Sequence, residues 1–152
     1  MIYNRTQADV DEAIRIRREK VQTFQELTEV EEEILERGMM TIDTLNRIEG
    51  KQAELKELFR DMGYFCGDIQ NKAWDYMQIF NRDEFDRILK NTDALRDAFF
   101  VFSETPQTPP VSFHYEDINA LEKILHDLDV MINDVKSHYR ECGTFECGED
   151  ES

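Results

Sequence analysis

The longest regular stretch of the chain, residues 115–139, has the sequence YEDINALEKILHDLDVMINDVKSHY. Its apolar residues alternate at intervals of three and four, which is the spacing of one face of an α-helix. They are Ile118, Leu121, Leu125, Leu128, Ile132, Val135 and Tyr139. This pattern predicts a helix from near His114 or Tyr115 to about Tyr139, with a seam suited to packing against other helices at a shallow angle. The seam fits either the core of this chain or an intermolecular coiled coil.

Similar spacing upstream predicts four more helices, each beginning at a capping residue. The caps are Thr6, Thr28, Thr41 and Asn81, and Gly38 is placed to end the second helix. The first helix should place Val10, Ala13, Ile14, Val21, Phe24 and Leu27 on one side. The helix that begins at Thr41 should bury Ile42, Leu45, Ile48, Leu55, Phe59 and Met62. The helix that begins at Asn81 should bury Phe85, Ile88, Leu89, Thr92, Leu95, Phe99 and Phe102. We expect Leu121, Leu125, Leu128 and Ile132 to pack against Leu45, Leu55, Phe59, Leu95 and Phe99.

Two stretches are expected to lack regular structure. Residues 63–80 contain Gly63, Gly67 and the only tryptophan, Trp74, and suggest a loop with one helical turn or more. Residues 103–110 form a proline-rich strap, because Pro106, Pro109 and Pro110 exclude both a helix and a central strand. The sequence therefore predicts an all-α fold: an antiparallel helical bundle of about four to five helices in a single domain, residues 1–140, followed by an acidic tail, residues 141–152.

Charge and composition bear on whether the chain folds and on whether it binds nucleic acid or spans a membrane. The 152 residues include 34 acidic and 18 basic side chains, a formal net charge of −16, yet 40% are apolar, which is enough for a core. The negative charge disfavours nucleic acid, and the basic cluster at residues 15–20 follows acidic neighbours that fit a solvated helix face. No apolar run approaches the length of a membrane span. Without an apolar stretch at the N-terminus, we expect the chain to be made and folded in a cytoplasm.

Catalytic motifs are not evident in the sequence. It contains no Ser-His-Asp spacing, no phosphate-binding glycine loop and no HExxH. The many carboxylates lie on polar helix faces, where solvation is the expected state. We therefore expect a protein that is not an enzyme and uses no cofactor.

The C-terminal cysteines allow three interpretations. His138 and Cys142 lie four residues apart at a predicted helix end, and Cys142 and Cys147 bracket a turn. These three could bind Zn²⁺, with Cys66 or water as the fourth ligand. Reduced thiols are the expected state, and a disulfide between Cys142 and Cys147 is the other alternative. We expect no catalytic role, because the surrounding carboxylates disfavour a thiolate.

Three predicted helix starts resemble one another. Aligned by their caps, residues 41–49, 81–89 and 114–122 share acids in the first turn, then an apolar residue, then Asn46, Asp86 or Asn119, and then Ile or Leu. The polar residue lies one turn inside the helix, beside the core stripe. A reused capping pattern and an internal duplication explain this equally well.

Five stretches of the chain resemble, in order, small proteins encoded among the tail and baseplate genes of phages and prophages of Gram-positive bacteria. They are residues 4–11, 44–49, 93–99 with 105–109, 118–125 and 139–148. The resemblance covers almost the whole chain and implies a virion protein of the tail. It supplies no catalytic residue. Tail proteins occur in several copies around an axis, so it also implies other tail or baseplate proteins as partners and a homo-oligomer.

Three functions follow as hypotheses. The first is a non-enzymatic phage tail or baseplate structural or adaptor protein. The second is an acidic mimic of DNA, or another phage inhibitor of a host enzyme. The third is a small metal or redox module at the C-terminus. For the first, the expected interaction residues are those of the strap and the seam: Pro106, Pro109, Pro110, Ile118, Leu121, Leu125, Leu128 and Ile132.

Overall fold

Capping residues set where the helices begin. The side chains of Thr6, Thr28, Thr41 and Asn81 each accept a hydrogen bond from a backbone N–H in the first turn of the helix that follows. These N–H groups have no partner inside a helix, so a cap stabilises the helix start. All four predicted caps are confirmed.

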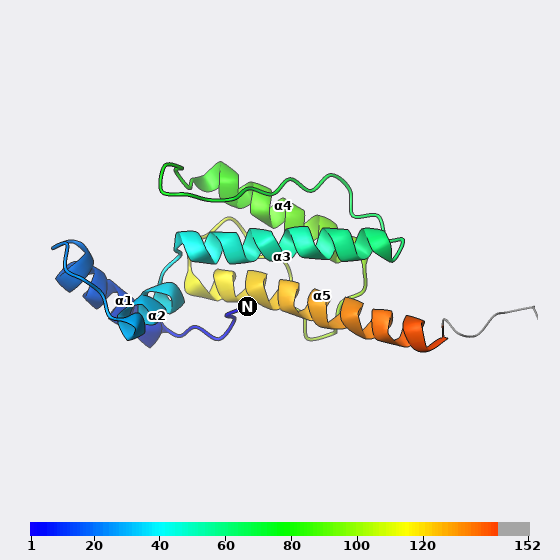
Figure 1. Cartoon of the computed structure of the whole chain (residues 1–152), viewed down its shortest axis with the longest axis horizontal. Coiled ribbons are helices and arrows are strands. Elements are labelled where there is room, and N and C mark those ends of the chain that lie inside the picture. Colours follow the sequence, from blue (N-terminus) through cyan, green and yellow to red (C-terminus); the bar gives the residue numbers. More distant parts are fainter. Residues whose placement is uncertain (143–152) are drawn as a thin grey trace, which may run out of the picture.

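The structure is a computed structural model that describes residues 1–142, with side chains described up to residue 138. Within this part of the chain it has no strand and five α-helices: α1 (Gln7–Ile16), α2 (Glu29–Gly38), α3 (Ile42–Asp61), α4 (Arg82–Ala98) and α5 (Tyr115–Cys142) (Figure 1). A π-helical turn, η1 (Arg17–Val21), continues α1. The predicted all-α helical bundle is confirmed. α5 continues past its expected end and past the expected start of the tail at residue 141.

Helices α3, α4 and α5 lie side by side and run in the same direction (Figure 1). Contacting pairs advance along both partners together: Glu49 of α3 contacts Arg87 of α4, and Phe59 of α3 contacts Phe99, the residue directly after α4. Between α3 and α5, Arg47 pairs with Glu122 and Lys51 with Asp129. The expectation of an antiparallel arrangement is therefore wrong for these three helices.

Long connections make the parallel arrangement possible. α3 has 20 residues, which is about 30 Å of helix, and an extended chain of roughly ten residues covers that distance. Residues 62–81 join α3 to α4, and residues 99–114 join α4 to α5. Both are long enough to run back along the bundle, as Figure 1 shows. We call them the first and second return segments.

One hydrophobic core joins these three helices and the first return segment. The nine residues expected to pack together all belong to it: Leu45, Leu55, Phe59, Leu95, Phe99, Leu121, Leu125, Leu128 and Ile132. Cys66, Ile69 and Trp74 of the return segment are buried in the same cluster. Phe102 is an exception to the expected face of α4, because the helix ends at Ala98 and Phe102 is 40% exposed.

Helices α1 and α2 form an antiparallel hairpin at one end of the bundle (Figure 1). Arg37 of α2 pairs with Asp9 of α1 at 2.9 Å. The helices come very close at Gly38, where a Cβ atom would lie 2.2 Å from the carbonyl oxygen of Asp9 and 2.5 Å from the Cβ of Ala13. Gly38 ends α2 as predicted, and it also permits this close approach.

The first helix is shorter than expected. Helical structure ends at Val21, and Phe24 turns the chain with a φ of 56°. The N–H of Gln25 donates to the carbonyl of Lys20 at 2.9 Å, and the N–H of Phe24 donates to that of Val21 at 3.2 Å, which is a Schellman motif. Phe24 occupies the position that glycine usually takes in this motif, and it is 96% exposed. The expected apolar side running through Phe24 to Leu27 is therefore wrong.

None of the helices within residues 1–142 is long and apolar enough to span a membrane.

Candidate functional site

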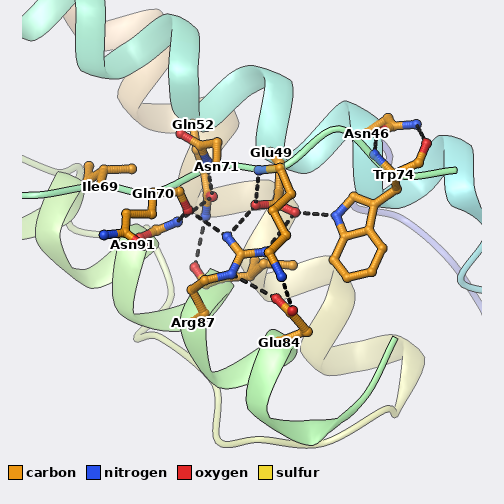
Figure 2. A network of polar contacts seen from close by, with 12 residues as sticks. Asn46, Glu49, Gln52, Ile69, Gln70, Asn71, Trp74, Glu84, Arg87 and Asn91 are labelled. Carbon is orange, nitrogen blue, oxygen red and sulfur yellow. Dashed lines mark hydrogen bonds and ion pairs between the residues drawn. The ribbon is translucent and has the colours of Figure 1, made fainter. Parts of the chain in front are cut away.

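The first return segment has no helix or strand along its length, so its backbone groups need other partners. Side chains of α3 and α4 supply them (Figure 2). Lys56 donates to the carbonyl of Ile69 at 2.9 Å. Asn91 and Arg87 both donate to the carbonyl of Gln70, at 2.8 Å and 2.6 Å. The segment is thus fixed to the bundle through its main chain.

Asn46 of α3 holds both main-chain polar groups of Trp74. Its Oδ1 accepts the Trp74 N–H at 2.7 Å, and its Nδ2 donates to the Trp74 carbonyl at 3.1 Å. Three positions along the helix, Glu49 accepts a hydrogen bond from the indole N–H of the same tryptophan (Figure 2). Residues three apart share a helix face, so one face of α3 holds the main chain and the side chain of one residue.

Glu49 is a fully buried carboxylate whose partners all come from the chain. Arg87 donates to its two oxygens at 2.5 Å and 3.0 Å, and the backbone N–H of Lys72 donates at 3.1 Å. A charge is tolerated in a protein interior when it is paired and hydrogen-bonded in this way. The hydrogen bond to Glu49 raises the pKa of Arg87 above its ordinary value, so the guanidinium stays charged.

Asn119 and Glu122 of α5 hold Arg5 in the same way. Asn119 Oδ1 accepts the Arg5 N–H at 3.1 Å, and Nδ2 donates to the Arg5 carbonyl at 3.0 Å. The Arg5 guanidinium donates to Glu122 at 2.7 Å. Glu122 also accepts hydrogen bonds from Arg47, at 2.8 Å and 3.3 Å, and from the backbone N–H of Ile2. The segment before α1 is therefore fastened to α5.

The two sites share the pattern Asn-x-x-Glu. We call them clamp 1 (Asn46, Glu49) and clamp 2 (Asn119, Glu122). In each, the amide holds both main-chain groups of one residue, the carboxylate binds a side-chain N–H of that residue, and an arginine from elsewhere in the chain, Arg87 or Arg47, neutralises the carboxylate. The third similar helix start has no such pattern, and its Asp86 pairs with Lys90 at 2.6 Å. The likeness between α3 and α5 thus extends beyond their caps.

A third buried carboxylate, Asp127 of α5, holds the second return segment. It accepts a hydrogen bond from the hydroxyl of Thr105 at 2.6 Å and pairs with Lys123 at 2.5 Å. The hydroxyl of Thr108 donates to Asp93 of α4. The N-terminal segment and both return segments are therefore each fastened to the bundle by one buried carboxylate.

The expectation that the carboxylates lie on solvated helix faces is wrong for these three. Glu49, Glu122 and Asp127 are 1%, 0% and 2% exposed. In the part of the chain that the structure describes, each is surrounded by donors from the chain itself, so the arrangement fixes the course of irregular segments. Asn46 and Asn119 stood out in the sequence as polar residues beside core stripes. A glutamate three positions after each was the signal that sequence reasoning missed.

The first return segment presents an exposed apolar tip, residues 75–79, between two anchors. Clamp 1 holds Trp74 on one side, and on the other Phe80 packs against the Trp74 ring with ring centroids 5.5 Å apart. The exposed fraction is 93%, 90% and 83% for Tyr76, Met77 and Ile79. Neighbouring apolar side chains exposed to this degree are typical of an interaction site.

The residues predicted to form an interaction surface lie elsewhere in the fold. The seam residues Ile118, Leu121, Leu125, Leu128 and Ile132 are all buried in the core of this chain, so α5 has no exposed seam at these positions. The strap lacks helix and strand as predicted, but it is fastened to its own bundle. Pro109 is buried, Pro106 is half-buried and Pro110 is exposed.

The structure does not bring the described candidate metal ligands together. His138 is exposed, and its Nδ1 lies 2.8 Å from the carbonyl oxygen of Asp134. Cys142 ends α5, and Cys147 lies outside the described residues. Cys66 is in the core, where burial raises the pKa of its thiol. Among the side chains that the structure describes, no group of three or more His, Cys, Asp or Glu is placed to bind a metal ion. A site using Cys147 stays a prediction.

In comparisons with known proteins, no family model, no curated protein and no solved structure matches the chain.

Proposed function

We propose that the chain is a non-enzymatic structural protein of a phage tail or baseplate, which acts as an adaptor or assembly piece through protein–protein contacts. The observation that carries the proposal is that three buried carboxylates each fasten one irregular segment to the bundle. One result is the apolar tip, which clamp 1 and Phe80 hold in place. A fixed apolar anchor loses little conformational freedom on binding, which favours a docking role.

The hydrogen bonds made by the three buried carboxylates support a structural role for these side chains. Catalytic acids and bases need a free oxygen directed toward a place for substrate. The oxygens of Glu49, Glu122 and Asp127 are occupied by hydrogen bonds from arginine, lysine, tryptophan, threonine and backbone groups of the same chain.

The tail assignment rests on the resemblance of five sequence stretches to small proteins encoded among tail and baseplate genes. A tail component repeats around an axis, so the proposal includes contacts with other tail proteins and between copies of the chain. The protein is then made in the bacterial cytoplasm and incorporated into the virion.

Purified particles of a phage that encodes the chain test this proposal. Mass spectrometry and immunogold labelling should find the wild-type chain at the tail end. Serine at Tyr76, Met77 and Ile79 should reduce its incorporation while circular dichroism shows unchanged helicity. The matched control places serine at three other exposed apolar residues, Val30, Phe65 and Phe100. Absence of the wild-type chain from particles contradicts the tail assignment, and normal incorporation of the tip variant contradicts docking through the tip.

The acidic decoy remains the alternative. Such a decoy needs a continuous acidic surface, and carboxylates of Glu29, Glu32, Glu33, Glu36 and Asp43 do line one groove beside α2. Cations interrupt this surface, however, since Arg47 pairs with Glu36 and Lys20 pairs with Glu31 on the same helix. The geometry therefore favours the adaptor.

A further inference from the structure

An open apolar groove of about 640 Å³ lies between the α1–α2 hairpin and the start of α5. Its apolar lining comes from α1, from the residues after α2, and from residues in and just before α5, and includes Val10, Ile14, Met39, Met40 and Phe113. Ile14 is 43% exposed and Phe113 is 58% exposed. The groove thus offers apolar surface that the chain itself leaves open to solvent.

Arg17 gives this groove a positive charge that the chain leaves unpaired. It lines the groove, is exposed, and has no ion-pair or hydrogen-bond partner among the described side chains. Arg15 pairs with Glu12 and Lys20 with Glu31, and Arg18, which has no ion pair in the described structure either, lies outside the groove lining. Arg17 also begins η1, and single π-helical turns are frequent at functional sites. The groove therefore fits an occupant that is apolar and carries one negative charge.

The tip of the first return segment has this chemistry. Tyr76, Met77 and Ile79 are its exposed apolar residues. Asp75, at its start, is exposed and has no ion pair in the described structure, and one of its carboxylate oxygens accepts the backbone N–H of Met77 at 2.8 Å. The tip is thus an apolar projection with one negative charge, complementary to the groove.

The first return segment turns toward α4 at the end of the bundle where α1 and α2 lie (Figure 1). Phe113 of the groove packs against Phe80, the residue directly after the tip, with ring centroids 5.8 Å apart. Because the tip and the groove are neighbours, a two-fold axis can place the tip of each copy in the groove of the other. Both contacts then form at once, and the result is a closed dimer.

We propose that the occupant of the groove is the tip of a second copy of this chain. In the resulting two-fold dimer, each tip enters the groove of the other copy, and Asp75 of one copy pairs with Arg17 of the other. The inference deepens the proposed function, since it specifies the contact between copies, and it rests on that function only for its biological setting.

Sedimentation equilibrium of the full chain tests the contact, over concentrations from about 1 μM to about 1 mM. The wild type should be a dimer. Arg17→Glu and Asp75→Arg each place like charges at both contacts and should raise the dissociation constant at least about tenfold. An equimolar mixture of these two variants should recover heterodimers, because one contact is then wild type and the other has exchanged charges. Asp75→Asn keeps an acceptor for Met77 and should weaken the dimer while the tip keeps its shape.

Arg18→Glu and Asp68→Arg are matched controls, because both residues are exposed and lie outside the tip and the groove lining. They should leave the dimer unchanged. A monomeric wild type, a mixture that fails to associate, or controls that weaken the dimer as much as the test variants would each overturn the inference. A dimer missing from phage particles would overturn the proposed function only, and a monomer found in particles would overturn this contact only.

Discussion

The side-chain amide of Asn119 hydrogen-bonds both main-chain groups of Arg5, although 114 sequence positions separate the two residues. Arg5 is 6% exposed and its guanidinium binds Glu122, so the segment before the first helix is part of the bundle. The same relationship between Asn46 and Trp74 fixes the first return segment. A bundle of parallel helices needs return segments between its helices. Buried polar side chains supply the hydrogen-bond partners for the backbone of these segments.

Removing Glu122 should strongly destabilise the fold. Glu122→Ala leaves the Arg5 and Arg47 guanidinium groups without their shared carboxylate. Breaking a buried pair by deleting one partner costs about 3–5 kcal/mol. Urea denaturation should show that loss in the free energy of unfolding, while Glu33→Ala at an exposed position changes it by less than about 0.5 kcal/mol. Similar effects of the two variants would argue against clamp 2.

Two glycines should respond oppositely to alanine. At Gly38 the new Cβ would meet the backbone of Asp9 and force α1 and α2 apart, with a cost of about 1–3 kcal/mol. Gly50 lies within α3 with nothing within 4 Å of a Cβ, so alanine there should stabilise the fold by about 0.5–1 kcal/mol. Thermal melts of both variants measure this, and a wild-type melting temperature for Gly38→Ala would contradict the close approach.

A substitution at Leu125 tests whether the apolar seam of α5 belongs to the core of this chain. It is 0% exposed, so Leu125→Ala should lower the free energy of unfolding by about 2–5 kcal/mol. Val130 on the same helix is 44% exposed, and Val130→Ala should have a small effect. A Leu125→Ala variant as stable as wild type would mean that α5 is peripheral.

Acid should weaken the ion pairs that join the first return segment to α4. The hydrogen bond from Lys72 lowers the pKa of Glu84 below its ordinary value of 4.5, against the opposing effect of burial, and Arg87 adds to the lowering. A carboxyl with a lowered folded pKa stabilises the protein above its unfolded pKa, and this contribution is lost as the pH falls through the folded pKa. Wild type should therefore melt higher than Glu84→Gln near neutral pH, and the difference should shrink below about pH 4.5. A difference independent of pH would exclude this linkage.

Local signals account for the parts of the fold that the sequence predicted. Threonine and asparagine caps act within one helical turn, so they mark the helix starts directly, and the apolar spacing identifies the buried face. Helix direction depends on the route of the connections, which the pattern within each helix does not encode. The length of residues 62–81 was the available indication that the chain returns along the bundle before α4 begins.

The clamps were harder to predict because their partners are distant in sequence. Asn46 binds a residue 28 positions away, and Asn119 binds one 114 positions away. Nothing near Trp74 or Arg5 marks either residue as a partner. Burial of Glu49 and Glu122 follows only once α3 and α5 are packed, so their carboxylates resembled the many solvated ones.

Amide hydrogen exchange, measured by NMR, tests most directly whether clamp 1 holds the first return segment. The N–H groups of Trp74 and Lys72 lie outside any helix, yet they donate to Asn46 and Glu49 at 2.7 Å and 3.1 Å. Both should exchange slowly in the wild type. Asn46→Ala should accelerate exchange at Trp74 while the amide of the core residue Leu55 stays protected. Exchange of the wild-type Trp74 amide at the rate of an unstructured peptide would contradict the account.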